Sequence, residues 1–240
     1  MTDYFEARGV SAEFYKDSKL PAYYKEILEN LPQNARILDF GCGFGQNLFA
    51  IKNKRFEWKM GGGSKDFRLV GIDINPNAID FVKSLDIEAI LIEDIFSFKP
   101  KERFDLIITT HTLEHLPKEN LINILKYFRE FLLKENGAIF VAVPNAQSFT
   151  GCYWAYEDFT HHTLFTAGSL IYVLKMSGFK SVEIIDKDAL AGSKGIKKWI
   201  KKIFLKFYKL HIKFWCKMTN SAFHAPSPQV FSYEIKALAH

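Results

Sequence analysis

Apolar residues along the chain follow two alternating patterns. Short runs rich in β-branched and aromatic residues are apolar at successive positions, as is typical of parallel strands buried on both faces. Between them lie segments whose apolar residues recur every three or four positions, which indicates helices with one buried face. The runs predict strands over 36–40, 68–73, 88–93, 104–110, 138–143 and 181–186, and a last one over 229–239.

Helix signals punctuate the segments between these strands. Asn75 before Pro76 provides an N-cap and a first-turn proline, and Thr166 offers a similar cap later in the chain. Gly137 and Gly178 stand where helices would end. Helices are therefore expected over 76–85, 117–137 and 167–178. Strands and helices in this alternation predict the α/β class, with an open, doubly wound, mostly parallel sheet.

The sequence divides into two expected parts. A helical cap over 1–35 precedes one domain over 36–240 that contains the sheet. The cap is rich in aromatic residues, and it could cover a ligand as a lid or pack on the edge of the sheet. A long connection over 52–67 contains a glycine run and is expected to form a loop inside the domain. A helical insert over 192–226 separates the last two strands.

The net charge of +5 comes from this insert. Residues 194–217 contain nine lysines and no acidic residue, so the rest of the chain is net acidic. Ile196, Ile200 and Phe207 recur at helical steps, which predicts a basic amphipathic helix over 194–218. Such a helix suits peripheral contact with an anionic membrane. Packing on the domain or on a second copy in a homodimer are alternatives, and nucleic acid is the least favoured partner.

Three further features of the sequence favour a location in the cytosol. The three cysteines are scattered, the start has no signal-peptide pattern, and no apolar run approaches the ~18 residues of a membrane span. We therefore expect a cytoplasmic protein, with attachment to the inner face of the membrane as the option that the basic helix adds.

A glycine-rich turn follows the first predicted strand. The stretch ILDFGCGFGQN, residues 37–47, places Gly41, Gly43 and Gly45 between a strand and the start of a helix. Glycines there let the backbone pass close to a ligand, and the helix N-terminus can receive a negative group. The spacing is one residue tighter than the G-x-G-x-x-G dinucleotide fingerprint, so a tight structural turn remains an alternative.

Two acids at the ends of the next strands strengthen the interpretation as a ligand site. Asp73 ends the second strand, where a carboxylate can accept hydrogen bonds from both ribose hydroxyls of an adenosine. Asp94 follows the third strand, where it can receive an adenine amino group. Ligands of doubly wound sheets bind beyond the carboxyl ends of the strands, and all three features fall at that edge.

From about residue 30 onward the chain resembles class I S-adenosylmethionine-dependent methyltransferases. The matching stretches are LDFGCGFG, GIDINPNAI, EDIF, FDLIITTHTLEHLP and VPN. The resemblance implies S-adenosyl-L-methionine as the cofactor and a Rossmann-like sheet of seven strands. Its last strand, over 229–239, would be antiparallel and would lie beside the sixth. The long connection over 52–67 departs from the family pattern and would reshape one rim.

The same resemblance implies roles for individual residues. Asp39 and the glycine loop would lie near the methionine part of the cofactor, and Asp73 would bind its ribose. Ile74 and Ile95 would flank the adenine, whose amino group Asp94 would hold. The full set of expected cofactor contacts is Asp39, Gly41, Cys42, Gly43, Gly45, Asn47, Asp73, Ile74, Asp94, Ile95, Thr110 and His111.

Histidine pairs raise the question of a metal. The segment HTLEH, residues 111–115, matches the H-x-x-E-H motif of inverted zinc proteases, which needs both histidines on one helical face. Here the segment leaves a strand, meets Pro117, and falls where the methyltransferase class has its LEHL segment. His161 and His162 are neighbours whose side chains point in different directions. No metal site is therefore expected.

The catalytic candidates come from the same two histidine-containing segments. DFTHHTLFT, residues 158–166, resembles the D-x-T-H-x-x-x-F-T segment of methyltransferases found with bacterial surface-polysaccharide and small-metabolite pathways, and His162 lies outside that pattern. His161 is interpreted as a base or acceptor-orienting residue, with a purely loop-pinning role as the alternative. Glu114 and His115 are further catalytic candidates, with packing of His115 beneath the site as the alternative.

These features predict transfer of a methyl group from S-adenosylmethionine to a small-molecule or glycan-linked acceptor. The acceptor atom is expected to be an oxygen, in capsule or other surface-polysaccharide biosynthesis or related metabolism. By analogy with the family that the chain resembles, the absence of an N-P-P-Y-like sequence after the fourth strand argues against methylation of the amino groups of nucleic-acid bases. Two alternatives stay open: a nicotinamide-dependent oxidoreductase, and a non-catalytic membrane or partner adaptor built on the same fold.

Overall fold

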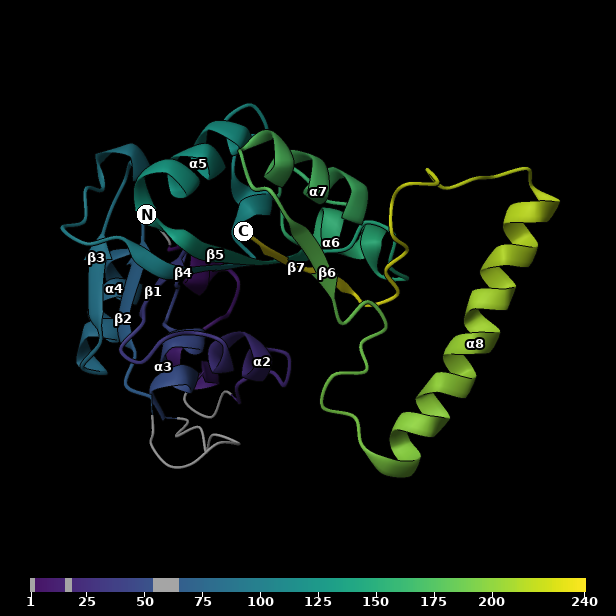
Figure 1. Ribbon diagram of the computed structural model, residues 1–240, viewed down its shortest axis with the longest axis horizontal. Coiled ribbons are helices and arrows are strands. Elements are labelled where there is room, and N and C mark those ends of the chain that lie inside the picture. The colour runs from purple at the N-terminus through teal and green to yellow at the C-terminus, as the bar shows by residue number, and fades with distance from the viewer. Residues whose placement is uncertain (1–2, 16–18, 54–64) are drawn as a thin grey trace.

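A computed structural model describes residues 3–15, 19–53 and 65–240 (Figure 1). Most of the predicted connection over 52–67, and with it the whole glycine run, lies outside these ranges. The strands are β1 Arg36–Phe40, β2 Arg68–Asp73, β3 Glu88–Leu91, β4 Phe104–Thr110, β5 Leu133–Pro144, β6 Val182–Ile185 and β7 Glu234–Ala239. The helices are α1 Tyr4–Ala7, η1 Ala12–Tyr15, α2 Tyr24–Glu29, α3 Gln46–Asn53, α4 Pro76–Ser84, η2 Ile95–Ser97, η3 Leu113–His115, α5 Leu121–Tyr127, η4 Phe128–Leu132, α6 Gly151–Glu157, α7 Ala167–Met176 and α8 Gly195–Met218.

The seven strands form one sheet in the order β3-β2-β1-β4-β5-β7-β6. The neighbours from β3 to β5 are all parallel, whereas β7 lies between β5 and β6 and is antiparallel to both. The doubly wound sheet and its antiparallel seventh strand are therefore confirmed. Because β1 and β4 are neighbours and the order reverses there, the carboxyl ends of β1, β2 and β4 open a crevice at one edge of the sheet.

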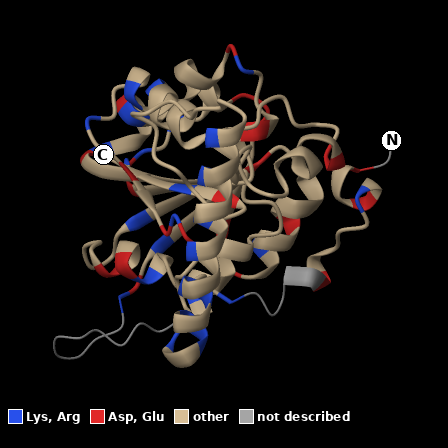
Figure 2. Cartoon of the chain, turned by 90° about the vertical axis from the view of Figure 1, so that its right-hand side faces the viewer, with Lys and Arg blue, Asp and Glu red and all other residues tan. Residues whose placement is uncertain are grey.

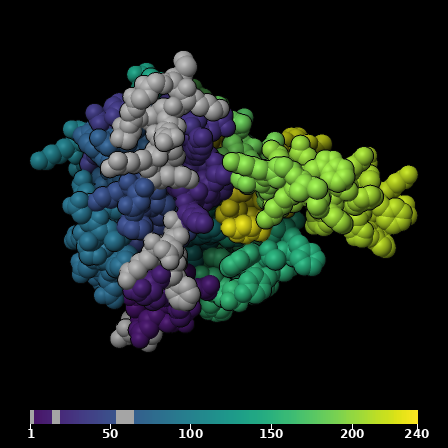
Figure 3. Space-filling view, turned by 90° about the horizontal axis from the view of Figure 1, so that it is seen from below, coloured from purple at the N-terminus to yellow at the C-terminus, as the bar shows by residue number. Residues whose placement is uncertain are grey.

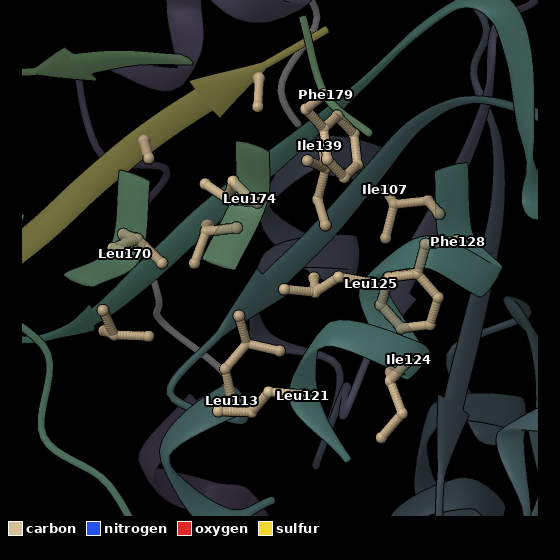
Figure 4. Packing of buried hydrophobic residues seen from close by; sticks show 14 of the residues in the cluster. Ile107, Leu113, Leu121, Ile124, Leu125, Phe128, Ile139, Leu170, Leu174 and Phe179 are labelled. Carbon is tan, nitrogen blue, oxygen red and sulfur yellow. The ribbon is translucent and has the colours of Figure 1, made fainter. Parts of the chain in front are cut away.

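Successive residues of the central strands bury opposite faces of the sheet. On β1, Leu38 joins the cluster beneath α5 and α7, whereas Ile37 joins the cluster beneath α2 and α3. The first cluster is the larger, and in Figure 4 side chains of α5 and α7 such as Leu125 and Leu174 gather around Ile139 of β5. Burial on both faces explains why these strands read as continuous apolar runs.

Several boundaries differ from the sequence-based prediction. The helix expected over 117–137 begins only at Leu121, and after the π-helical turn η4 the chain enters β5 at Leu133. Leu133 pairs with Phe104 across the sheet, so strand pairing replaces the helical continuation that the apolar stripe suggested. The last strand begins at Glu234 instead of residue 229, because the amides of Phe231 and Ser232 donate to Lys187 instead of to a strand.

The α8 helix stands beside the sheet domain instead of packing into it (Figures 1 and 3). None of its residues is buried. Lys209 ties it to Asp188 through a 2.9 Å ion pair and lies 4.7 Å from the centre of the Phe231 ring. No helix in the described ranges is both long and apolar enough to cross a bilayer.

Candidate functional site

The glycine loop after β1 has a conformation that requires its glycines. Gly41 and Gly43 have φ angles of +71° and +50°. A Cβ added to Gly41 would lie 2.4 Å from atoms of Thr112. The amides of Gly41 and Cys42 donate to the carbonyl of Ile72 at 2.9 and 3.0 Å, which fastens the loop to the end of β2. The sequence-predicted turn is thus held at the crevice.

Asp73 organises the loop from the neighbouring strand. Its Oδ2 accepts from the Gly43 amide at 2.8 Å, and its Oδ1 accepts from the Asn75 amide at 2.9 Å. Each carboxylate oxygen has a further lone pair. The carboxylate is only half-buried and the next side chain, Ile74, is 75% exposed. An acid and an apolar surface therefore stand side by side at the mouth of the crevice.

Asp39 lies deeper, at the end of β1, with only 1% of its surface exposed. Asn47 donates from Nδ2 to Asp39 Oδ2 at 3.4 Å and to Thr110 Oγ1 at 2.9 Å. Asp39 Oδ1 has no hydrogen-bond partner among the described residues. Burial raises the pKa of Asp39 to about 7, which the Asn47 hydrogen bond opposes and the nearby Asp73 charge reinforces.

This environment makes the stability of the native protein depend on pH, and an Asp39→Asn variant removes that dependence. The folded protein keeps a proton on Asp39 up to a pKa of about 7, whereas an ordinary aspartate releases it near 3.8. The native protein therefore loses stability as pH rises through that window, and the variant does not. Between pH 5 and pH 8 the variant should gain on the order of 2–3 kcal/mol relative to the native protein.

Urea unfolding of the ligand-free protein at the two pH values measures the difference. Asp80→Asn is the matched control, because Asp80 is exposed on α4. A stability gap between the Asp39→Asn variant and the native protein that stays constant with pH would contradict the buried acid.

Of three other predicted contacts, Asp94 is exposed, whereas Ile95 and Cys42 are buried. Asp94 accepts from the Phe96 amide at 3.0 Å and thereby caps η2. Ile95 is 7% exposed and packs with the core, so little of its side chain is accessible. The Cys42 thiol is also directed inward, against Gly71 of β2. Only the backbone of Cys42 is placed at the glycine loop.

His111 stands at the end of β4 with a φ of +53°. Its Nδ1 lies 3.4 Å from Glu114 Oε1, and its Nε2 lies 3.2 Å from Glu234 Oε2. Burial of the ring lowers the pKa of His111, but hydrogen bonds and charges from the two carboxylates outweigh this effect and raise the pKa to about 9. The side chain is nevertheless 46% exposed. His111 is therefore a cation between two acids at neutral pH.

The second histidine-containing segment docks on the first. The amides of His162 and Thr163 donate to the Glu114 carbonyl at 2.8 and 3.2 Å, so residues 158–163 lie against η3. The rings of His115 and His161 meet edge to face, with centres 4.6 Å apart. His162 is exposed. The structure thus brings together the three catalytic candidates, Glu114, His115 and His161.

Asp158 anchors this segment and connects it to the N-terminus. Thr160 donates to its Oδ1 at 2.6 Å, and Tyr4 donates to its Oδ2 at 2.6 Å. Arg8 Nη1 adds an ion pair at 3.3 Å. Burial opposes ionisation, but the hydrogen bonds from Thr160 and Tyr4 lower the pKa of Asp158 to about 2. It is a charged structural anchor at every physiological pH.

The N-terminal segment 3–8 spans both sides of the crevice. Asp3 accepts from the side chains of Asn75 and Asn77 at 2.6 and 3.1 Å, and Phe5 lies against Gly43. Tyr4 and Arg8 hold the other side, through Asp158. No sequence pattern indicates these contacts, because Tyr4 and Asp158 lie 154 positions apart. Of the two roles considered for the cap, its first helix has the position of a lid.

Comparison with known proteins places this arrangement in a class. The methyltransferase domain family matches residues 12–184, more than half of the chain. Solved structures of S-adenosylmethionine-dependent methyltransferases have the same fold. The chain belongs to the methyltransferase domain family. No curated protein matches its sequence.

Solved structures show the same fold at low sequence identity. A methyltransferase from Archaeoglobus fulgidus aligns with a TM-score of 0.62 and 21% identity over 99% of both chains. A TehB-like methyltransferase from Corynebacterium glutamicum aligns with a TM-score of 0.52 and 14% identity, over 98% of this chain and 91% of the other. A methyltransferase from Thermotoga maritima aligns with a TM-score of 0.54 and 14% identity, over 91% of this chain and 88% of the other.

The residues at the crevice fit the cofactor of this family. S-adenosylmethionine carries a diol, an adenine and a cationic methionine end, and it supplies a methyl group bonded to a sulfonium sulfur. Asp73 has lone pairs for the diol, and Ile74 offers an exposed apolar side chain. The unpaired Asp39 Oδ1 lies close to the glycine loop, where it suits a cationic group. The cofactor is therefore S-adenosylmethionine, and the nicotinamide alternative loses its support.

Proposed function

We propose that the protein methylates a hydroxyl oxygen of a small-molecule or glycan-linked acceptor, in surface-polysaccharide or related metabolism. The hydrogen bonding of His161 carries this proposal. Its Nδ1 lies 2.7 Å from the Trp154 carbonyl, which can only accept, so Nδ1 bears the proton and Nε2 holds a free lone pair. Such a nitrogen can take a proton or orient a hydroxyl.

An oxygen acceptor explains why a histidine with a free ring nitrogen would be useful here. A sugar or phenol hydroxyl must lose its proton as the bond to the methyl carbon forms, whereas a carboxylate or phosphate is already anionic. Alignment of the two reactants supplies most of the acceleration, at about 7–11 kcal/mol of the barrier. A positioned base adds roughly 10²–10⁴-fold in rate.

An acceptor panel tests the proposed chemistry. Purified protein is incubated with S-adenosylmethionine and free sugars, nucleotide sugars or phenols, and S-adenosylhomocysteine is quantified by mass spectrometry. Matched amines and carboxylates run in parallel. Transfer to a hydroxyl compound supports the proposal, and transfer confined to amines or carboxylates would refute it. Cofactor binding without transfer to any compound would favour the non-catalytic adaptor.

We further propose that α8 attaches the enzyme to an anionic membrane surface. Its apolar side chains are exposed, including Trp199 at 63%, Phe204 at 69% and Phe207 at 63%. They lie on a different side of the helix from Lys209, which contacts the domain. The domain therefore does not cover the apolar face, although packing against it was one alternative left open by the sequence.

Charge favours a lipid surface over a second copy of the chain as the occupant of this face. The helix contains eight lysines and no acid, and Figure 2 views the side of the molecule on which they lie. Two such helices would repel each other in a homodimer, whereas anionic headgroups attract each lysine by about 1 kcal/mol. Tryptophan and phenylalanine are side chains that enter the headgroup region.

Vesicle co-sedimentation checks the membrane contact. The protein should bind phosphatidylglycerol-containing vesicles, and phosphatidylcholine vesicles at least tenfold more weakly, with binding reduced by salt. Phe204→Glu with Phe207→Glu should weaken binding at least tenfold, because burial of each ring contributes about 1.5–3 kcal/mol. Met176→Glu, at an exposed apolar residue of α7, is the matched control. Dimerisation without vesicle binding would show that a second copy covers the face instead.

A further inference from the structure

Three potential metal ligands converge at the contact between η3 and the 158–163 segment. Glu114, His115 and His161 each offer one ligand atom, and these atoms all lie within 4.8 Å of one another. Around an ion with ligand bonds of about 2.0–2.2 Å, neighbouring ligands stand roughly 3–3.5 Å apart. Small side-chain rotations would therefore bring the three ligand atoms to the spacing that a bound ion requires.

Glu114 is the least ordinary member of this cluster. It is fully buried, yet neither of its carboxylate oxygens has a hydrogen-bond partner among the described residues. Its contact with His111 at 3.4 Å involves Oε1 and leaves Oε2 without a partner. A buried carboxylate oxygen is expensive to leave unsatisfied. A bound cation would satisfy it.

The hydrogen bonds of the two histidines leave the same nitrogen free in each. His161 donates from Nδ1 to the Trp154 carbonyl. The Thr160 hydroxyl donates to Asp158, so its oxygen accepts from His115 Nδ1 at 2.8 Å. Both Nε2 atoms therefore hold lone pairs, and the nearest carboxylate to His161 Nε2, on Asp158, is 3.9 Å away. Metal-bound histidines characteristically donate their other N–H in this way.

We propose that Glu114, His115 and His161 bind a divalent first-row transition-metal ion. Two imidazoles and one carboxylate form a donor set that suits zinc or iron(II) and leaves positions open for another ligand. The sequence patterns predicted no metal site, because they pair His111 with His115 and His161 with His162. The structure joins one histidine from each pair and adds the buried acid.

The ion has a defined role in the proposed methylation, on which this part of the inference rests. An acceptor hydroxyl bound at the open position is acidified and loses its proton to solvent. The oxygen lone pair then forms the bond to the methyl carbon, and the electron pair of the broken carbon–sulfur bond stays on sulfur. His161 would thus activate the acceptor as a ligand instead of as the base itself.

Metal titration of untagged, ligand-free protein tests the site without any acceptor. Equilibrium dialysis against Zn²⁺ should give one ion per chain, and Co²⁺ should develop visible absorption bands of a nitrogen- and oxygen-bound ion. His115→Ala and His161→Ala should each weaken binding at least tenfold, whereas His162→Ala should not. His115 is partly exposed, whereas only 6% of the His161 side chain is, so the His115→Ala variant tests the site even if a change at His161 or Glu114 prevents folding.

The outcomes separate this site from the proposed function. Absence of saturable binding, or unchanged binding in the His161→Ala variant, would overturn the metal site. If methyl transfer to a hydroxyl is equally fast in the presence of a chelator, the role of the ion is overturned, whereas the proposed function stands. Metal binding that requires His115 and His161, together with transfer that chelator abolishes and Zn²⁺ restores, is the result expected.

Discussion

Replacement of Asp73 by alanine should weaken S-adenosylmethionine binding by about 1.5–3 kcal/mol, which is roughly a 10- to 150-fold increase in Kd. The carboxylate accepts from the amides of Gly43 and Asn75 and keeps lone pairs for the ribose hydroxyls. The variant therefore loses direct hydrogen bonds to the cofactor and one of the fastenings of the glycine loop. Isothermal titration with the cofactor and with S-adenosylhomocysteine measures the loss.

Asp80→Ala is the control for this experiment. Asp80 lies on the exposed side of α4, seven positions after Asp73, and its replacement should leave both affinities unchanged. Circular dichroism and the unfolding midpoint establish that each variant is folded. Cofactor affinity equal to that of the native protein in the Asp73→Ala variant would refute the ribose assignment, whatever happens to turnover.

The cofactor side of the crevice was predictable because its residues are set by local sequence. A strand followed by closely spaced glycines defines the loop, and an acid directly after the next strand must reach the same edge of a parallel sheet. Gly41, Gly43 and Asp73 come together in the structure for this reason. Ile95 shows the limit of such reasoning, because its position after β3 did not reveal that its side chain enters the core.

The acceptor side, as we call the part of the crevice formed by η3 and residues 158–163 where we propose that the acceptor binds, was less predictable because it is assembled from segments distant in sequence. Glu114 meets residues 158–163 through backbone hydrogen bonds from His162 and Thr163, which no side-chain pattern announces. Tyr4 reaches Asp158 across 154 positions. Strand pairing also overrode local periodicity at Leu133, where an apolar stripe typical of a helix continues into β5. Tertiary contacts decided each of these features.

The position of α8 adds a spatial requirement to the proposed chemistry. Lys209 of α8 lies against Phe231, three residues before Glu234 of β7, and Glu234 contacts His111 at the end of β4. A membrane-attached α8 would therefore hold the acceptor side of the crevice near the bilayer, where a lipid-carried glycan could reach it. A soluble acceptor would gain nothing from that attachment.

Replacement of His161 by alanine should lower the turnover number by roughly 10²–10⁴-fold while leaving cofactor affinity within twofold. Its Nε2 lies 3.9 Å from Asp158 Oδ2, whereas the predicted cofactor contacts lie at the glycine loop and Asp73. The same loss is expected whether His161 takes the proton directly or holds the metal ion, since either role is removed with the ring. Turnover is measured with the hydroxyl acceptor identified by the panel.

His162→Ala is the matched control, because it removes a neighbouring imidazole that is exposed and keeps the backbone amide that donates to Glu114. Near-native turnover in that variant, together with the loss in the His161→Ala variant, would assign the effect to one ring instead of to the loop as a whole. Turnover close to that of the native protein in both variants would mean that His161 takes no part in the transfer and only pins the loop through Trp154. In that case alignment of the two reactants would account for the catalysis.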